Sequence, residues 1–276
     1  MARLPLLEVL ALSSLACATA RVEPKAAKEI LQVPAPTARS VAQQILPHNV
    51  RVILYDGDEP RRTASGVVVG SEVSASGSAS YVLTNAHAVT TEGMQKPRMT
   101  IMVDHGPDAV EYAAEGVALG QVPDMDLALI RVRGASLQPA VLAEDSELEP
   151  GEDVVVAAAP YGKSVSLSGG MVSQVEWDRS SRKPKMLKTD AAIGYGASGG
   201  GVFSRTSGRL LAIVEGYRTA KVGFAVAEQA YSFDVPMPGE TFAAPSSKVR
   251  DFLKSHGFGR FLEPRAAPIN ARASAR

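Results

Sequence analysis

Short β-rich segments separated by turn-forming clusters follow one another from residue 49 to residue 217. The segments are rich in valine, isoleucine and threonine, which favour extended backbone. The clusters between them, such as DGDEP at 56–60 and DHGPDA at 104–109, are rich in residues that favour tight turns. With 24 glycines, 18 prolines and only 5% aromatic residues, the composition also indicates many turns and few long helices.

The β-rich segments fall into two sets. In chain order they are 49–56, 64–73, 79–86, 98–104, 115–121 and 126–134, then 152–160, 164–177, 186–194, 200–204 and 209–217. This spacing is typical of closed or nearly closed antiparallel barrels. A single β-sandwich has similar spacing, so the segments alone predict an all-β fold and leave both architectures open.

The first twenty residues have the features of an export signal. A basic residue precedes an apolar run at 4–16 that is too short to span a bilayer. Two processing routes are open. One is cleavage after Ala20, and the other is lipidation of Cys17, because SLAC resembles a bacterial lipoprotein box in which Ser14 replaces the usual aliphatic residue. We expect an exported protein of the bacterial periplasm or envelope, attached to the membrane if Cys17 is lipidated.

Helices are predicted at the two edges of the β-rich region. Residues 21–46 form a linker rich in Ala, Lys and Pro that ends in a short helix, with Ser40 as its cap. A second helix is predicted over 246–256, with Ser246 or Ser247 as its cap and an apolar stripe on one face. The remaining residues, 257–276, are predicted to be disordered.

Charge and cysteine content exclude several classes of protein. Lys plus Arg and Asp plus Glu both number 29, so no overall charge indicates binding to nucleic acid. Cys17 is the one cysteine, so no disulfide within the chain is available. No His, Cys and Asp cluster has the spacing of metal ligands, and we expect no metal and no cofactor.

Three residues have the pattern of a nucleophile, its base and a group that orients the base. Ser198 lies in GYGASGGG, where glycine-rich backbone can aim amide hydrogens at one point. His87 follows an apolar segment in TNAHAV, and either Asp126 or Asp124 precedes the apolar LALIRV. Each also has an ordinary interpretation, as a flexible loop, a histidine at a strand end and a turn aspartate.

The order histidine, aspartate, serine and its surroundings resemble the chymotrypsin-like serine proteases, and more closely their bacterial HtrA (Deg) branch. TDAAI and GVF around the serine, PYGKSVSLSGGMVSQV and GRLLAIV fall in register with that family over residues 47–256. The resemblance implies two six-stranded antiparallel barrels, at about 47–146 and 147–245, before the helix at 246–256.

The resemblance also implies the roles of site residues. Ser198 is the nucleophile and His87 the base, and the family pattern selects Asp126 over Asp124. The amides of Gly196 and Ser198 form the oxyanion hole. The residues of the primary substrate pocket are then Ile193, Val214, Glu215 and Gly216.

Two further features follow from comparing positions with the family: the preference of the primary substrate pocket, and one long insertion. Ala192 stands where a trypsin-like enzyme has an acidic residue, which predicts a preference for an apolar side chain of modest size. The segment at 217–240 is longer than the corresponding family loop. It is either a contact for substrate or partner, or an added β-hairpin.

These features predict an exported serine endopeptidase that cleaves unfolded or partner polypeptides in envelope quality control. Residues 257–276 alone follow the last predicted helix, so we expect a protease domain without a PDZ domain, and homo-oligomer contacts are one way of ordering its active-site loop. Ala197 and Gly201 depart from the family's serine motif. An alternative is therefore a protease-fold binding or chaperone module whose oxyanion loop is incompetent.

Overall fold

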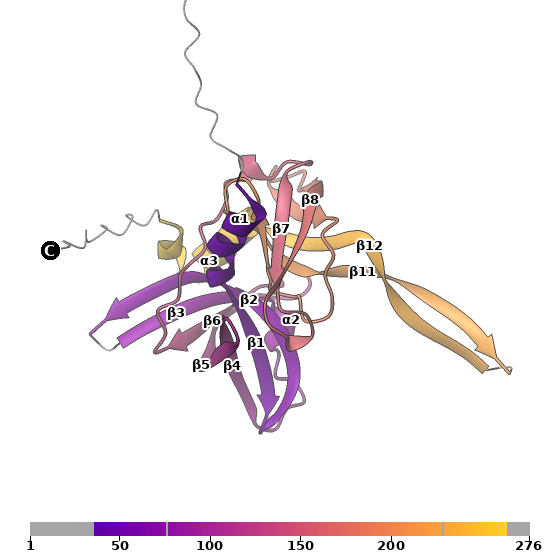
Figure 1. Cartoon of the computed structure of the whole chain (residues 1–276), viewed down its shortest axis with the longest axis horizontal. Coiled ribbons are helices and arrows are strands. Elements are labelled where there is room, and N and C mark those ends of the chain that lie inside the picture. Colours follow the sequence, from indigo (N-terminus) through magenta and orange to yellow (C-terminus); the bar gives the residue numbers. More distant parts are fainter. Residues whose placement is uncertain (1–35, 76, 228, 264–276) are drawn as a thin grey trace, which may run out of the picture. The chain divides into compact units, whose positions relative to one another are not determined.

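The computed structural model describes residues 36–75, 77–227 and 229–263, which form two closed antiparallel barrels of six strands each (Figure 1). The predicted architecture is therefore confirmed, and the single sandwich is excluded. The predicted signal segment at 1–20, Cys17 within it, and residues 264–276 of the predicted tail lie outside the described residues.

Each barrel is closed by pairing between its first strand and a later one. The first barrel contains β1 (Asn49–Asp56), β2 (Glu59–Ser74), β3 (Gly77–Thr84), β4 (Pro97–His105), β5 (Asp108–Leu119) and β6 (Ala128–Arg133), in the order β1-β2-β3-β6-β5-β4. The second contains β7 (Asp153–Ala158), β8 (Ser166–Trp177), β9 (Pro184–Thr189), β10 (Gly201–Ser204), β11 (Leu210–Val226) and β12 (Gln229–Pro245), in the order β10-β11-β12-β9-β8-β7.

The helices are short and lie between or outside the strands. They are α1 (Ala38–Ile45), α2 (Ala86–Val89) and α3 (Ser246–Ser255), with single 3₁₀ turns at η1 (Leu46–His48), η2 (Asp145–Glu147), η3 (Pro160–Gly162) and η4 (Gly259–Leu262). None of the helices within these described ranges is long and apolar enough to cross a membrane.

Both predicted helix caps are wrong. α1 begins earlier than predicted, because the Thr37 hydroxyl oxygen accepts a hydrogen bond from the Ser40 amide at 3.1 Å and caps the helix instead of Ser40. α3 has Pro245 at its N-cap and no side-chain cap. The buried Ser247 hydroxyl donates to the Pro184 carbonyl at 3.2 Å. This hydroxyl, a predicted cap of α3, therefore makes a tertiary hydrogen bond instead.

The prediction of disorder from residue 257 onward is wrong for its first part. Phe258 and Phe261 pack against the Tyr81 ring of β3, with centroids 5.7 and 4.7 Å apart. Phe261 also covers Gly70 of β2, where an added Cβ would lie 2.7 Å from its ring. Apolar contacts of this kind fix a segment that its basic composition alone would leave in solvent.

Three buried apolar clusters form the core. One fills each barrel, and the third lies between them and receives side chains from both, including Leu83 of β3, Phe203 of β10 and Phe252 of α3. α1 contributes Val41 and Ile45 to this third cluster. The two barrels are therefore joined by a continuous apolar contact, which is the main source of their mutual stability.

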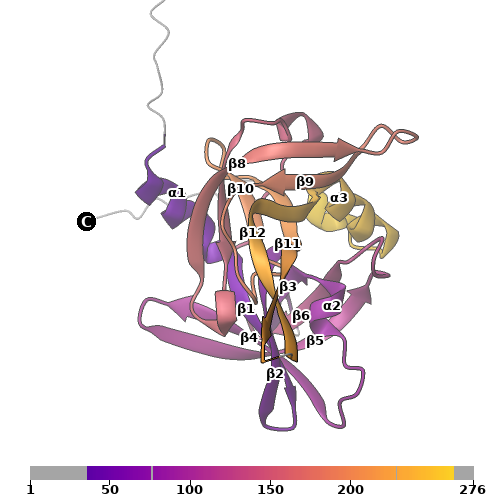
Figure 2. The same ribbon diagram turned by 90° about the vertical axis from the view of Figure 1, so that its right-hand side faces the viewer.

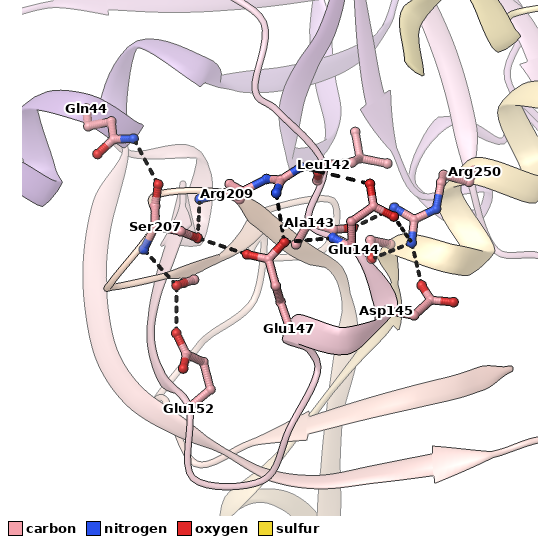
Figure 3. Close-up of polar contacts among 12 residues, drawn as sticks. Gln44, Leu142, Ala143, Glu144, Asp145, Glu147, Glu152, Ser207, Arg209 and Arg250 are labelled. Carbon is pink, nitrogen blue, oxygen red and sulfur yellow. Dashed lines mark hydrogen bonds and ion pairs between the residues drawn. The ribbon is translucent and has the colours of Figure 1, made fainter. Parts of the chain in front are cut away.

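Polar contacts hold the connection between the barrels against the second barrel and α3 (Figure 3). Arg250 of α3 donates to the Ala143 carbonyl and pairs with Asp145. Arg209 donates to the Leu142 carbonyl at 2.9 Å and pairs with Glu147 at 3.0 Å. These contacts fix the connecting segment at residues 142–147, although it contains little regular structure.

β11 and β12 continue beyond the second barrel as a two-stranded ribbon, here called the arm (Thr219–Val226 paired with Gln229–Pro236). The ribbon projects from the barrels in Figure 1 and is seen end-on in Figure 2. The predicted insertion at 217–240 is therefore a hairpin.

Candidate active site

His87 and Asp126 are brought together by pairing of β3 and β6 in the first barrel. α2, which carries His87, follows β3, and Asp126 lies just before β6. Because these strands are antiparallel, the end of one lies beside the start of the other. The Asp126 carboxylate accepts hydrogen bonds from His87 Nδ1 at 2.6 Å and from the His87 backbone amide at 2.9 Å. Asp124, the alternative in the sequence, is exposed.

The surroundings of Asp126 favour its ionised form. Burial by itself raises the pKa of this carboxyl, but the hydrogen bonds from the ring and backbone of His87 outweigh burial and hold the pKa of Asp126 below its ordinary value. The ionised carboxylate fixes the His87 ring with its Nδ1 hydrogen toward Asp126, which leaves Nε2 as the basic nitrogen.

Ser198 lies in the loop between β9 and β10, here called the serine loop (residues 194–200). Gly196 and Gly199 have φ angles of 87° and 84°, which glycine adopts without strain. A Cβ at Gly199 would lie 2.1 Å from the Ser65 carbonyl oxygen, so no larger residue fits. The methyl group of Ala197 is buried in the core of the second barrel. These contacts give the loop a fixed path.

The amides of Gly196 and Ser198 have no hydrogen-bond acceptor among the residues that the structure describes. The carbonyl of Tyr195 accepts from the Tyr161 amide at 2.6 Å, and the carbonyl of Ala197 accepts from within the loop at 2.9 Å. The N–H and C=O of a trans peptide point in opposite directions. Fixing these two carbonyls therefore fixes the directions of the two unpaired N–H groups.

Ser65 of β2 connects the serine loop to the first barrel. Its buried hydroxyl donates to the Gly196 carbonyl at 2.8 Å and accepts from the Ala159 amide at 2.8 Å. Its backbone amide donates to the Ser198 carbonyl at 2.8 Å, and its carbonyl accepts from the Thr84 hydroxyl at 2.8 Å. One side chain and its backbone thus fix the loop on both sides of the predicted nucleophile.

His87 and Ser198 line the same cleft, which has a volume of about 840 Å³ and receives residues from both barrels. The Ser198 hydroxyl donates to the Glu215 carbonyl at 3.4 Å, its one hydrogen bond within the described part of the chain. This distance lies beyond the usual range for an O–H donor, so the bond is weak. Tyr161 and Tyr195 pack edge-on at 6.3 Å and form an aromatic rim to the cleft.

The four residues predicted to form a substrate pocket lie in different environments. Val214 is fully buried in the core of the second barrel, and Ile193 packs against that core. The Glu215 carboxylate pairs with Lys248 of α3 at 3.0 Å, and burial raises the pKa of Glu215 despite this attraction. Gly216 is half-buried. Of the described residues that line the cleft above, none is one of these four.

Ser65, Tyr161 and Tyr195 are site residues that were not predicted from the sequence. Ser65 is the one hydroxyl in the otherwise small and apolar run ASGVVVG, which is the signal that could have drawn attention to it. Within residues 36–75, 77–227 and 229–263, no group of three or more His, Cys, Asp or Glu side chains is arranged to hold a metal ion.

Known proteins resemble this chain in sequence and in fold. The family model for the trypsin-like peptidase domain matches residues 64–213, which is more than half of the chain. The chain belongs to this family. The crystal structure of Deg5 has the same fold, with a TM-score of 0.57 and 21% identity over 77% of this chain and 90% of that one.

Among curated relatives, this trypsin-like peptidase domain is similar to HtrA-type proteases. It is 28% identical over 228 residues to serine protease HTRA1 of Xenopus laevis, covering 78% of this chain and 42% of that protein. It is 30% identical over 181 residues to a probable periplasmic serine endoprotease DegP-like of Marinomonas sp., covering 64% of this chain and 34% of that protein. The chain therefore spans less than half the length of either relative.

Replacing Ser65 with alanine tests whether its hydroxyl orders the serine loop. Ser65→Ala leaves two buried backbone groups unpaired. We therefore expect the free energy of unfolding to fall by about 1–3 kcal/mol, and labelling by a fluorophosphonate probe to become slower by roughly tenfold or more. Ser80→Ala is the matched control, because the buried Ser80 hydroxyl also bonds one backbone carbonyl (Ala135, 3.0 Å) and one amide (Leu137, 2.9 Å), neither of which belongs to the serine loop. Equal labelling rates in the two variants would contradict the role of Ser65.

The lowered pKa of Asp126 predicts a pH-dependent contribution to stability. Because its pKa is lower in the folded than in the unfolded chain, ionised Asp126 stabilises the fold above the ordinary pKa of about 3.9, and this contribution is lost as pH falls through the folded value. Denaturant unfolding should show Asp126→Asn to be less stable than wild type at neutral pH, with the difference shrinking in acid. Asp124→Asn is the control and should change little at either pH. A difference that persists in acid would contradict the assignment.

Proposed function

We propose that the chain is a serine endopeptidase in which Ser198 is the nucleophile, His87 the general base and Asp126 the group that orients the base. The observation that carries this proposal is the short contact between His87 and Asp126 beside a cleft that also contains Ser198. The family match supports the same reaction class. A hydrogen-bonded imidazole next to a serine in a fixed glycine-rich loop is the arrangement that activates a hydroxyl.

The reaction begins when the Ser198 hydroxyl leaves the Glu215 carbonyl and turns toward His87 Nε2. The existing bond is long at 3.4 Å, so little stabilisation opposes this rotation. Ser198 Oγ then attacks the substrate carbonyl carbon while His87 takes its proton. Asp126 stabilises the imidazolium through Nδ1. His87 next gives the proton to the leaving amine. Water then attacks the acyl-enzyme while His87 again acts as base, and His87 returns the proton to Ser198 Oγ as the acid product leaves.

The unpaired amides of Gly196 and Ser198 are the proposed oxyanion hole. The amides of Tyr161 and Gly200 hold the carbonyls of Tyr195 and Ala197, which share their peptides with these two N–H groups, so no loop rearrangement is needed before the N–H groups bind the developing negative charge. Such donors each contribute roughly 100- to 1000-fold in rate. This arrangement favours an active peptidase over the alternative of a binding module with an incompetent loop.

For substrates, we propose unfolded or partner polypeptides, bound across the cleft with the scissile bond at Ser198. The backbone of β11 at 214–217 is the proposed edge for the chain on the acyl side, and Ile193 and Gly216 border the pocket for its side chain. With Val214 buried and Glu215 paired to Lys248, an apolar side chain of modest size fits this pocket best.

Labelling by a fluorophosphonate tests the proposed nucleophile directly. Wild-type protein should react covalently and should cleave unfolded casein, whereas Ser198→Ala should lose labelling and about 10⁴-fold or more of the cleavage rate. Ser180→Ala, at the exposed turn between β8 and β9, is the control and should behave as wild type. Equal labelling of Ser198→Ala and wild type would remove Ser198 from the mechanism. A wild-type protein that binds casein but is not labelled would favour the binding-module alternative.

We further propose that the chain is exported and acts in protein quality control of the bacterial envelope. The similarity to a probable periplasmic DegP-like endoprotease supports this location, together with the apolar N-terminal run. Mass spectrometry of protein recovered from the envelope fraction should show either a start at Arg21 or a lipid-modified Cys17. Recovery from the cytosol with the first residues intact would contradict export.

A further inference from the structure

The arm carries an apolar face that nothing in the described chain covers. Directly opposed residues of an antiparallel pair point to the same side of the ribbon. Val222 pairs with Phe233 and Phe224 with Tyr231, so their side chains share one side. The apolar face comprises Val222, Phe224, Val226, Tyr231, Phe233 and Val235. Each of these is between 36% and 56% exposed.

The aromatic rings at the centre of this face form one continuous surface. Phe224 stacks on Tyr231 with ring centroids 5.5 Å apart and meets Phe233 edge-on at 6.1 Å. The valines lie around these rings. No charged side chain belongs to the face, whereas Lys221 and Asp234 oppose each other on the other side of the ribbon. Absence of charge with aromatic enrichment is typical of the centre of a protein interface.

A two-stranded ribbon with such a face is poorly suited to stand alone in water. Isolated hairpins are marginally stable, and a third strand or packing on the apolar face is normally needed. From Thr219 to Pro236 the described strands of the arm pair only with each other. Within residues 36–75, 77–227 and 229–263, no third strand or packed segment covers the face.

We propose that the apolar face of the arm is covered by the same face of a second copy of this chain. A patch that is uncharged throughout can meet its own copy around a two-fold axis without burying charge or opposing like charges. The formal net charge of the chain is also zero, so no long-range repulsion opposes association of identical copies.

The area of the face suits a weak, reversible interface. Its three half-exposed aromatic side chains expose roughly 100 Å² each and its three valines roughly 70 Å² each, which together supply roughly 500 Å² per copy. Two copies together bury roughly 1,000 Å², which is in the range of transient interfaces between proteins. The two ribbons then pack face to face as a small two-layer β-structure, with the strand layers about 10 Å apart. This pairing is independent of whether the chain hydrolyses peptides.

Sedimentation velocity of the full chain over about two orders of magnitude in concentration tests this proposal. Wild type should associate reversibly, and Phe224→Ser/Phe233→Ser should sediment at half the associated mass, with a dissociation constant at least about 100-fold higher. Val73→Ser/Leu119→Ser is the matched control, because both residues are exposed, at 79% and 58%, but lie in the first barrel. The control should associate as wild type does. Circular dichroism confirms that the arm variant keeps its strands.

Self-association through the arm would be overturned by a wild type that stays monomeric at every concentration. It would also be overturned by an arm variant that associates as strongly as wild type. If wild type is monomeric and its binding of fluorescent unfolded casein, measured by anisotropy, is lost in the arm variant, the face is assigned to substrate instead.

Discussion

The contact between the serine loop of the second barrel and β2 of the first is the constraint on which the site depends. His87 and Asp126 belong to the first barrel, whereas Ser198 and the unpaired amides belong to the second. At Gly199 the two barrels meet so closely that a Cβ would lie 2.1 Å from the Ser65 carbonyl oxygen. Misplacement by about 1 Å can lower a catalytic rate roughly 100-fold, so this contact has to be close and unique.

Most of the fold follows from local pattern. β1 to β11 each overlap a predicted segment in which β-branched residues lie between turn clusters, because such residues favour extended backbone. The bounds of β5 differ, since it begins at Asp108 although its predicted segment begins at residue 115. β12 was predicted only as part of a possible hairpin at 217–240, since Pro236, Pro238 and Gly239 interrupt its sequence. Proline is tolerated there because the arm has free edges, where a missing N–H leaves no partner unpaired. The packing of Phe258 and Phe261 on Tyr81 was also missed, because it joins residues that are far apart in the chain.

Motifs in the sequence place His87, Asp126 and Ser198 because their neighbours form recognisable strings. The structure locates His87 and Ser198 at one cleft and Asp126 in hydrogen-bond contact with His87, and the assignment of their roles remains our proposal. For Ser65 the sequence offers only a lone hydroxyl in an apolar run, which does not reveal its role. Its hydroxyl bonds a carbonyl 131 positions later in the chain, and nothing in ASGVVVG indicates that partner. The environments of Val214 and Glu215 likewise depend on α3 and on the core of the second barrel, which local sequence does not reveal.

The return of the C-terminal segment to the first barrel has a consequence for folding. After β12 and α3 complete the second barrel, Phe258 and Phe261 cross back to Tyr81, while α1 contributes Val41 and Ile45 to the cluster between the barrels. The packing around the first barrel thus includes residues that precede both barrels in the chain and residues that follow both. Neither barrel can lose its packing without exposing apolar surface of the other, so this arrangement couples the two halves into a single cooperative unfolding unit.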